Sequence, residues 1–224
     1  MNPYLPREAQ IIKRSEESPN TVSLLLRLTD GQPYDFAPGQ FNMLYLYGCG
    51  EVAISVVSDT EDSGLLMHTI RALGRITRGL TALKPGSRIG LRGPFGRGWP
   101  MTEAEGHDVV IVAGGIGLAP LRPALYHALA HRERYGRVVL LYGARTPRDM
   151  LYRKELERWR GSHHDLAMAP ATAETVLGDF DDASFDDRHL LIDLITYRQR
   201  ADWTAIADEN GELCYAMAIE VSEL

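Results

Sequence analysis

Residues 108–120, DVVIVAGGIGLAP, constrain the fold of this chain more than any other segment. An uninterrupted apolar run is typical of a strand that is buried on both faces of a parallel sheet. The glycines allow a sharp turn, and apolar residues spaced four apart then indicate a helix. A second apolar strand over residues 137–145, followed by a helix predicted from a Thr146 cap to Gly161, repeats the pattern. This alternation predicts an α/β domain with a parallel sheet.

The first hundred residues follow a different pattern. Short strand-like runs are separated by turn segments rich in glycine, proline and aspartate. Several short strands at regular spacing are typical of a closed or nearly closed antiparallel barrel. A short helix is expected over residues 77–83, and the Gly/Pro-rich residues 98–106 are the best candidate linker. We therefore predict an antiparallel β-barrel domain over residues 1–100 and an α/β nucleotide-binding domain over residues 106–224.

Composition narrows the class of partner. The 224 residues carry a net charge of −6, which gives no global electrostatic reason to bind nucleic acid or an anionic membrane. There is no run of 18 apolar residues, so we expect no membrane span. Two cysteines, Cys49 and Cys214, are too few for a disulfide scaffold, which fits a reduced, cytoplasmic setting.

The glycine turn carries the strongest local chemistry. Gly114, Gly115 and Gly117 stand between a buried strand and a helix start, where backbone N–H groups and the helix dipole favour a phosphate. The pattern is G-x-G-x-x-P and ends at Pro120, so the third glycine of a dinucleotide fingerprint is missing. A tight turn that binds nothing remains the alternative at this point.

A second turn favours the nucleotide interpretation. Gly143 follows the next buried strand, and Arg145 can donate to a phosphate or a ribose. Alternatively, Arg145 is a surface arginine that pairs with an acid. Two glycine turns at the carboxyl ends of consecutive parallel strands lie where open α/β sheets bind ligands, so together they favour a nucleotide site.

Four segments together resemble a known family: FAPGQFNMLYLYGCGEVAISVVSD, HTIRALGRITRGLTALKPGSRIGLRGPFGRGWP, DVVIVAGGIGLAPLRPAL and LYGARTPRDMLYRKELERW. Over residues 5–160 the chain resembles the ferredoxin–NADP⁺ reductase superfamily, in which a flavin-binding barrel precedes a pyridine-nucleotide domain. Within that superfamily it is most similar to the gamma subunits of sulfhydrogenases and the B subunit of anaerobic sulfite reductase. The resemblance implies FAD and either NAD or NADP as cofactors.

The family's flavin motif R-x-Y-S/T falls on residues 52–55 of this sequence. The resemblance places the Ser55 hydroxyl beside the isoalloxazine ring, while Ile54 replaces the usual aromatic residue and Val52 replaces the usual phosphate-binding arginine. A second motif, G-x-x-S/T, falls on residues 74–77, where Arg71 or Arg75 would supply the missing charge. Without the resemblance, Ser55 is a strand serine bonded to backbone and residues 74–77 form a helix-capping turn.

The resemblance implies no catalytic residue and no metal ligand, because the cofactors carry the chemistry. It implies cofactor contacts from the barrel and from both glycine turns, namely Val52, Ala53, Ile54, Ser55, Thr69, Ile70, Arg71, Gly74, Arg75, Ile76, Thr77, Gly114, Gly115, Ile116, Gly117, Pro120, Gly143, Ala144 and Arg145.

The resemblance fades after about residue 160. The family's C-G-P-x-x-M motif has only a weak counterpart in LCYAMA, residues 213–218. A [2Fe–2S] cluster needs about four thiolates, so two distant cysteines lead us to expect no iron–sulfur cluster in this chain. The acidic residues 178–187 and the SHHD segment, residues 162–165, suggest metal sites only weakly, and solvated surface is the preferred interpretation.

The expected function is an oxidoreductase subunit that passes electrons through FAD between NAD(P)H and a partner redox subunit of a hydrogenase- or sulfite-reductase-like complex. The alternative is a non-catalytic structural or regulatory subunit that keeps the reductase fold. The diverged tail and the absence of an arginine at Val52 favour the alternative.

Overall fold

The computed structural model describes residues 5–61, 64–144, 147–162, 166–169 and 189–194. They form two compact units, one of the residues up to Trp99 with Arg122–His127 and one of the other described residues. Each unit is described by itself below. No helix in the described ranges is long and apolar enough to cross a membrane.

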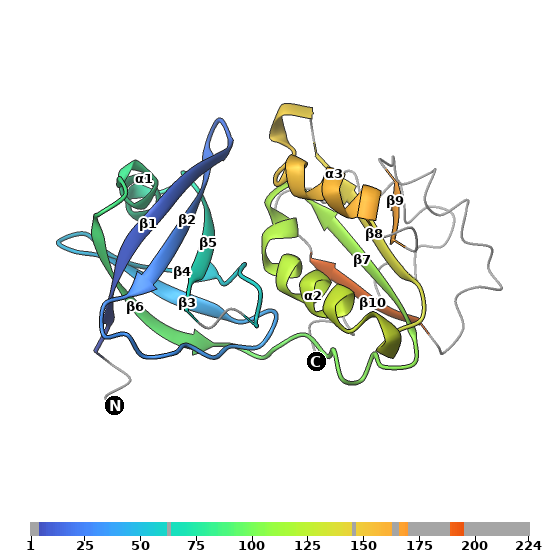
Figure 1. Ribbon diagram of the computed structural model, residues 1–224. Coiled ribbons are helices and arrows are strands. Elements are labelled where there is room, and N and C mark those ends of the chain that lie inside the picture. The colour runs from blue at the N-terminus through green and yellow to red at the C-terminus, as the bar shows by residue number, and fades with distance from the viewer. Residues whose placement is uncertain (1–4, 62–63, 145–146, 163–165, 170–188, 195–224) are drawn as a thin grey trace. The chain divides into compact units, whose positions relative to one another are not determined.

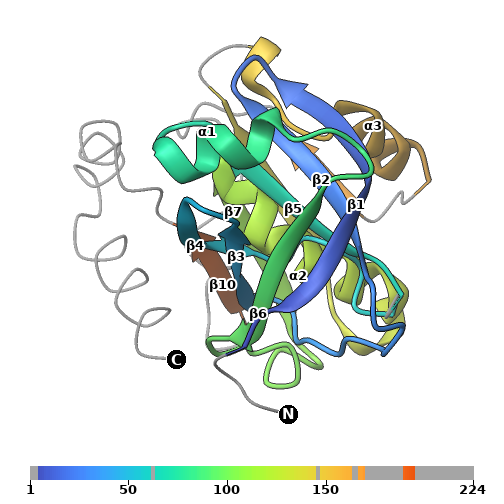
Figure 2. The same cartoon turned by 90° about the vertical axis from the view of Figure 1, so that its left-hand side faces the viewer.

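The first unit is a six-stranded antiparallel sheet with one helix (Figure 1). In chain order its elements are β1 (Arg7–Ser18), β2 (Thr21–Leu28), β3 (Phe41–Leu46), β4 (Gly50–Ser55), β5 (Leu66–Arg71), α1 (Arg75–Ala82) and β6 (Arg88–Phe95). The strand order is β4-β3-β6-β1-β2-β5, which leaves β4 and β5 as the two edges. Figure 2 shows these strands curling round so that the edges approach each other, with α1 at one end.

The two edge strands meet over only a few residues. Val56 and His68 form an antiparallel bridge, and the Val57 amide donates to the Met67 carbonyl at 2.9 Å. The Met67 amide in turn donates to the Ser58 hydroxyl. These contacts close the sheet into a barrel at one end of the β4–β5 seam, because they pair edge groups that would otherwise face solvent.

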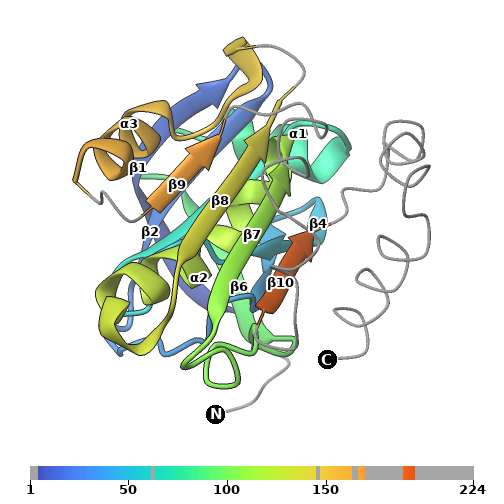
Figure 3. The ribbon, with the colours of Figure 1, turned by 90° about the vertical axis from the view of Figure 1, so that its right-hand side faces the viewer.

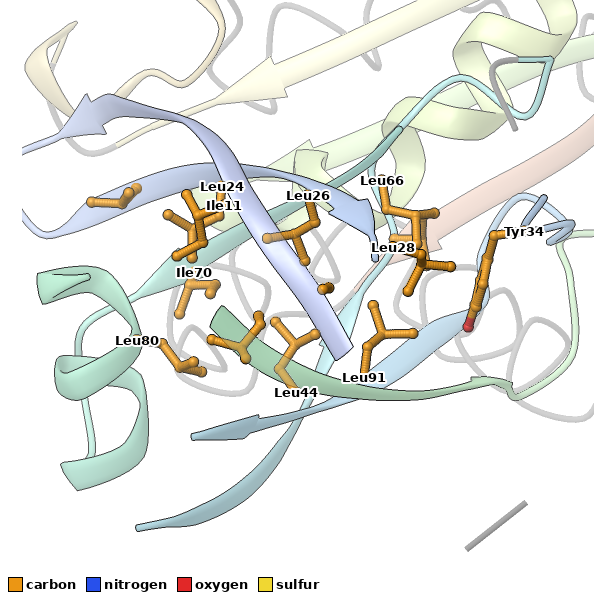
Figure 4. Packing of buried hydrophobic residues seen from close by; sticks show 14 residues of the cluster. Ile11, Leu24, Leu26, Leu28, Tyr34, Leu44, Leu66, Ile70, Leu80 and Leu91 are labelled. Carbon is orange, nitrogen blue, oxygen red and sulfur yellow. The ribbon is translucent and has the colours of Figure 1, made fainter. Parts of the chain in front are cut away.

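Alternating residues of the strands fill the barrel interior. Leu66, His68 and Ile70 of β5 are all buried, and Leu66 and Ile70 belong to a cluster with Leu24, Leu26 and the α1 residue Leu80. Figure 4 shows Leu80 at one end of this cluster and Tyr34 at the other. The period-two burial of strands explains why an apolar core forms from short segments that are distant in sequence.

Three polar side chains are buried at the Tyr34 end of the barrel. The Tyr34 hydroxyl bonds to Asn42 Oδ1, and Asn42 Nδ2 lies 3.3 Å from His68 Nε2. His68 Nδ1 lies 2.9 Å from the Ser55 carbonyl oxygen. Burial lowers the pKa of His68 from its ordinary value of 6.5 to about 4, although hydrogen bonds to the Ser55 and Ile54 backbone oppose the shift. The imidazole is therefore neutral at pH 7.

The second unit contains a four-stranded parallel sheet in the order β10-β7-β8-β9 (Figure 3). In chain order, the elements after Pro100 are β7 (Asp108–Gly114), a 3₁₀ turn (Gly115–Gly117), α2 (Leu118–Ala130), a 3₁₀ turn (Arg132–Arg134), β8 (Val138–Gly143), a 3₁₀ turn (Pro147–Asp149), α3 (Arg153–Ser162), β9 (Leu166–Ala169) and β10 (His189–Leu194). The predicted fold class, an antiparallel barrel followed by a parallel α/β domain, is confirmed.

The boundaries of the third helix were wrong. A helix was predicted from a cap at Thr146 to a stop at Gly161, but α3 begins at Arg153 and Gly161 lies inside its last turn. Residues 147–149 form a 3₁₀ turn instead, and Tyr152 adopts a left-handed backbone with φ of 52°. A residue in this conformation interrupts a right-handed helix, so the regular helix starts only after it. Thr146 itself lies outside the described residues.

The buried histidine predicts a pH dependence of stability. Between pH 6.5 and about 4 the unfolded chain binds a proton at His68 that the folded chain excludes, so the free energy of unfolding should fall as the pH is lowered. The full difference corresponds to about 3 kcal/mol, with most of the loss between pH 6 and pH 4. Urea unfolding across this range should show a steeper slope for the wild type than for His68→Leu or His68→Asn. Equal slopes would show that His68 is not held neutral.

Candidate functional site

The β4–β5 seam is the feature of the barrel that can hold a ligand. The edges are paired at Val56 and His68, whereas the rest of β4 pairs only with β3 and the rest of β5 only with β2 in the described part of the chain. Helix α1 closes the other end, where the Arg75 guanidinium donates to the Cys49 carbonyl at 3.1 Å. Backbone groups along the open edges are thus available to a planar ligand that offers donors and acceptors.

On the β4 side, the four residues of the first predicted motif divide between the two faces of the strand. Val52 and Ile54 are partly buried and pack against the barrel core. Ala53 is exposed, and Ser55 is half-buried on the same face as Ala53. The Ser55 hydroxyl has no hydrogen-bond partner among the residues described, although its carbonyl is bonded to His68. The alternative of a serine whose hydroxyl is bonded to backbone is therefore not what these residues show.

On the β5 side, the predicted residues differ in what they can offer. The Ile70 side chain is fully buried in the core, so only its backbone can contact a ligand. The Thr69 hydroxyl lies 2.8 Å from the Ser23 hydroxyl in a buried pair. Arg71 is different, because its Nε atom is buried and has no hydrogen-bond partner among the described residues. An unpaired buried guanidinium nitrogen is costly, and an anionic group at this position would satisfy it.

The start of α1 combines a cap with a basic side chain. The Thr77 hydroxyl accepts the amides of Gly74 and Leu73 at 2.9 and 3.1 Å and donates to the Gly74 carbonyl at 3.1 Å. The capping role that the sequence left open for Thr77 is therefore observed. Amides in the first turn of a helix lack partners within the helix, and they suit a phosphate. Ile76 packs against Gly50 and joins the helix start to β4.

Of the basic residues near the seam, Arg71 is the best phosphate donor. Arg75 is tethered to Cys49, and Arg92 on β6 donates to both carboxylate oxygens of Glu51 at 2.6 and 3.0 Å. This bidentate contact lowers the pKa of Glu51 and keeps Arg92 beside the carboxylate. Neither residue has an orphaned nitrogen like that of Arg71, so the geometry favours Arg71 for the charge that Val52 lacks.

In the second unit, the two predicted glycine turns lie side by side. Gly114 of β7 and Gly143 of β8 are neighbours in register at the carboxyl ends of the parallel strands. Gly115, Ile116 and Gly117 form the 3₁₀ turn that leads into α2, and Pro120 lies in the first turn of that helix. This is where parallel α/β sheets bind ligands, and the following helix directs its N-terminus there.

Glycine occupies positions 115 and 143 for different physical reasons. Gly115 has a φ of +53°, in the left-handed region that favours glycine. Gly143 has no such backbone, and a Cβ added to it would meet nothing within 4 Å. Neither conformation nor packing therefore requires glycine at position 143. The open space there, next to the half-buried Ala144, suits the close approach of a ligand.

Sequence reasoning missed Tyr142, which holds this loop in place. The Tyr142 hydroxyl donates to the Gly115 carbonyl at 3.0 Å and accepts the Leu151 amide at 3.0 Å. It thus joins the glycine loop to the segment that follows β8. The signal was a tyrosine within an otherwise aliphatic strand, since a buried hydroxyl needs hydrogen-bond partners.

Some predicted residues lie outside the described ranges. They include Arg145, Cys214, the acidic residues 178–187 and the histidines of the SHHD segment.

With this geometry in view, comparisons with known proteins are informative. Residues 111–207 match the family model of the oxidoreductase NAD-binding domain. The chain is 37% identical over 171 residues to the sulfhydrogenase 1 gamma subunit of Pyrococcus furiosus, an alignment that covers 75% of this chain and 57% of that protein. It is 30% identical over 189 residues to a probable dihydroorotate dehydrogenase B (NAD⁺) electron transfer subunit of the same organism, covering 84% and 65%.

The solved structures agree on the fold. A ferredoxin–NADP⁺ reductase from Plasmodium falciparum superposes with a TM-score of 0.71 at 16% identity, covering 92% of this chain and 91% of that one. The chain therefore has the two-domain fold of the ferredoxin–NADP⁺ reductases, and its second part matches the oxidoreductase NAD-binding domain. Its sequence is similar to sulfhydrogenase gamma subunits and to electron transfer subunits of dihydroorotate dehydrogenase B. The chain spans between 54% and 65% of the length of these three relatives.

Replacing Thr77 by valine should separate capping from ligand binding. Loss of the hydroxyl that accepts the Gly74 and Leu73 amides should lower the free energy of unfolding of the ligand-free protein by about 1 kcal/mol. FAD titration should also show weaker binding, because the amides at the helix start lose their fixed positions. The control is Thr81→Val, which removes a hydroxyl bonded to Arg78 later in the same helix. An equal loss of FAD affinity in both variants would contradict a specific role for the helix start.

Replacing Gly143 by valine tests the nucleotide loop. A Cβ at position 143 meets nothing within 4 Å, so the melting temperature should change by no more than a few degrees. Occupation of the space beside the strand end should weaken NADH and NADPH binding by about tenfold or more, a cost of about 1.4 kcal/mol or greater. Titration calorimetry would measure the loss, and FAD affinity serves as the internal control. Unchanged nucleotide affinity would remove Gly143 from the site.

Proposed function

We propose that this chain is a flavoprotein electron-transfer subunit that binds FAD at the β4–β5 seam and NAD(P)H at the glycine turns. One observation carries the flavin half. The strands on the two sides of the seam carry the unpaired Ser55 hydroxyl, on β4, and the Arg71 Nε atom that lacks a partner, on β5, and β5 leads to the start of α1. A flavin dinucleotide offers a polar ring edge and a diphosphate, and these residues are suited to both.

Each residue has a distinct task in this proposal. The Ser55 hydroxyl bonds to the polar edge of the flavin ring, and the unpaired edges of β4 and β5 offer further backbone partners. Arg71 and the first amides of α1 hold the diphosphate, while Thr77 fixes the turn before the helix through the Leu73 and Gly74 amides. Val52 and Ile54, which pack against the core, form the apolar support of the β4 side.

The nucleotide half rests on the paired turns at Gly114 and Gly143 and on the match to the oxidoreductase NAD-binding domain. Gly115 and Gly117 let the pyrophosphate approach the backbone, and Tyr142 fixes the Gly115 carbonyl. Bound FAD would supply the conversion of a hydride from NAD(P)H into single electrons for a partner subunit. The relatives named as sulfhydrogenase gamma and dihydroorotate dehydrogenase electron transfer subunits support a partner of the hydrogenase or dehydrogenase type.

The absorption spectrum of the purified chain, before and after reconstitution with FAD, is the decisive test. We expect a flavin band near 450 nm that is bleached by NADH or NADPH without oxygen and is restored by an added one-electron acceptor. Comparing the two nucleotides at equal concentration would assign the preferred one. A chain that takes up no FAD would refute the flavin proposal. A flavin that neither nucleotide reduces would leave the alternative, a non-catalytic subunit with the reductase fold.

The contribution of Arg71 can be measured in the same assay. Arg71→Met keeps much of the aliphatic stem but removes the charge, so FAD should bind about tenfold more weakly, as expected for one charge-assisted contact to phosphate. Riboflavin lacks the diphosphate and should show no such loss. Arg78→Met, an exposed residue of α1, is the matched control. Equal losses for FAD and riboflavin would show that Arg71 does not act on the phosphates.

A further inference from the structure

The buried polar residues at the Tyr34 end of the barrel have no role in the proposed function so far. Asn42 and His68 are fully buried, and Tyr34 is 4% exposed. An all-apolar core would avoid the cost of desolvating such groups. Their bonds run in one direction, from β3 and the preceding loop through His68 to the carbonyl of Ser55. That endpoint is the strand residue whose hydroxyl the proposed function assigns to the flavin ring.

The hydrogen atoms of this hydrogen-bond chain, from Tyr34 through Asn42 and His68 to Ser55, have one consistent arrangement. The Ser55 carbonyl can only accept, so His68 Nδ1 must donate to it. A neutral imidazole then has an unprotonated Nε2, which accepts from the Asn42 amide nitrogen. Asn42 Oδ1 is consequently directed at Tyr34, whose hydroxyl donates to it. Tyr34 is the other titratable member, and burial raises its pKa above the ordinary value, so it remains protonated.

The Asn42 amide is closely packed against β6. Gly93 has a φ of +148°, and a Cβ placed on it would lie 2.1 Å from Asn42 Oδ1 and 3.0 Å from the Tyr34 hydroxyl. The glycine therefore allows β6 to pass directly against the amide. At the outer end, the Arg7 guanidinium lies 5.6 Å from the centre of the Tyr34 ring and is held by Asp30 at 2.7 and 2.8 Å.

The hydrogen-bond chain ends at Ser55, where the barrel closes. The Val56 amide donates to the Gln40 carbonyl, toward β3, so the preceding Ser55 carbonyl points to the opposite side, toward β5. His68 Nδ1 donates to this carbonyl at 2.9 Å. His68 also forms the bridge with Val56. One side chain thus fixes the peptide on the carboxyl side of Ser55 and the last residue pair of the seam.

We propose that Tyr34, Asn42 and His68 are positioning residues that fix the Ser55 peptide, and through it the Ser55 hydroxyl, against the flavin ring. The inference rests on the proposed flavin site. It adds that hydroxyl placement depends on a hydrogen-bond chain inside the barrel, which contacts no cofactor. It also adds that the Ser55 carbonyl is already occupied, so Ser55 addresses the ring through its hydroxyl.

A double-mutant cycle tests this coupling in the full chain. Ser55→Ala should weaken FAD binding about fivefold, the size expected for one hydrogen bond, and should shift the flavin band. His68→Leu removes the donor to the Ser55 carbonyl and should cause a similar loss and a similar shift. In the His68→Leu background, Ser55→Ala should have almost no further effect. His68→Asn retains a side-chain N–H where Nδ1 stood and should recover part of the wild-type spectrum. Losses that multiply would overturn the positioning role.

Two further measurements separate positioning from general damage to the fold. Ile89→Ala opens a cavity in the β6 part of the core, and it should lower the melting temperature while leaving the flavin band in place. If it shifts the band as His68→Leu does, the role of His68 is merely structural. Imidazole ¹⁵N spectra of the flavin-free protein should show His68 protonated on Nδ1 and not titrating above pH 5. The opposite tautomer, or titration of His68 near pH 6.5, would contradict the hydrogen-bond arrangement on which the proposal rests.

These outcomes are distinguishable from failure of the flavin proposal. A wild-type chain that takes up no FAD would refute the flavin site and the positioning role together, whatever the ¹⁵N spectra show. A wild type that binds FAD, combined with variants whose effects multiply, would refute the positioning role alone.

Discussion

Closure of the barrel between Val56 and His68 is the contact on which the rest of the first unit depends. A six-stranded sheet that stayed open would expose two edges with unpaired backbone groups, and such edges promote aggregation. Here the edges are joined at one end by a few hydrogen bonds and bridged at the other by α1. A seam that is closed along its whole length would have no backbone groups left for a ligand. Partial closure therefore satisfies stability and leaves a site.

The closure also explains why polar residues are tolerated inside the barrel. His68 departs from the apolar pattern of β5, and its imidazole donates to the Ser55 carbonyl where the seam ends. Once an imidazole is buried there, its second nitrogen needs a donor, which Asn42 provides, and the amide oxygen needs another, which Tyr34 provides. Each buried group thus creates the requirement for the next. The hydrogen-bond chain ends near the surface, where Arg7 lies against Tyr34.

The sequence was informative where the physical signal is local. Short strand-like runs between turn segments predicted the barrel, and the apolar strands with glycine turns predicted the parallel sheet, both of which the structure confirms. The start of α3 was wrong because the left-handed backbone at Tyr152 leaves no mark in residue type. The roles of Tyr142 and His68 were missed for a similar reason, since their partners at Gly115 and Ser55 are distant in sequence. The assignments of individual cofactor contacts remain predictions, although the structure favours Arg71 over Arg75.

The replacement of arginine by Val52 is better understood from the position of this residue on β4. Val52 packs against the core together with Ile54. An arginine at this position would lose that apolar contact, and its charge would have to extend past the strand to reach a ligand. Arg71 stands on the strand across the seam, next to the start of α1, and its unpaired Nε atom lacks the partner that an arginine normally finds. Moving the charge from β4 to β5 keeps a cation beside the helix amides that would hold a diphosphate. The motif residues of β4 are then apolar except for Ser55, which supplies the polar contact to the ligand. On this view the substitution relocates the phosphate contact within the same seam, and loss of the motif arginine does not by itself argue against a flavin site.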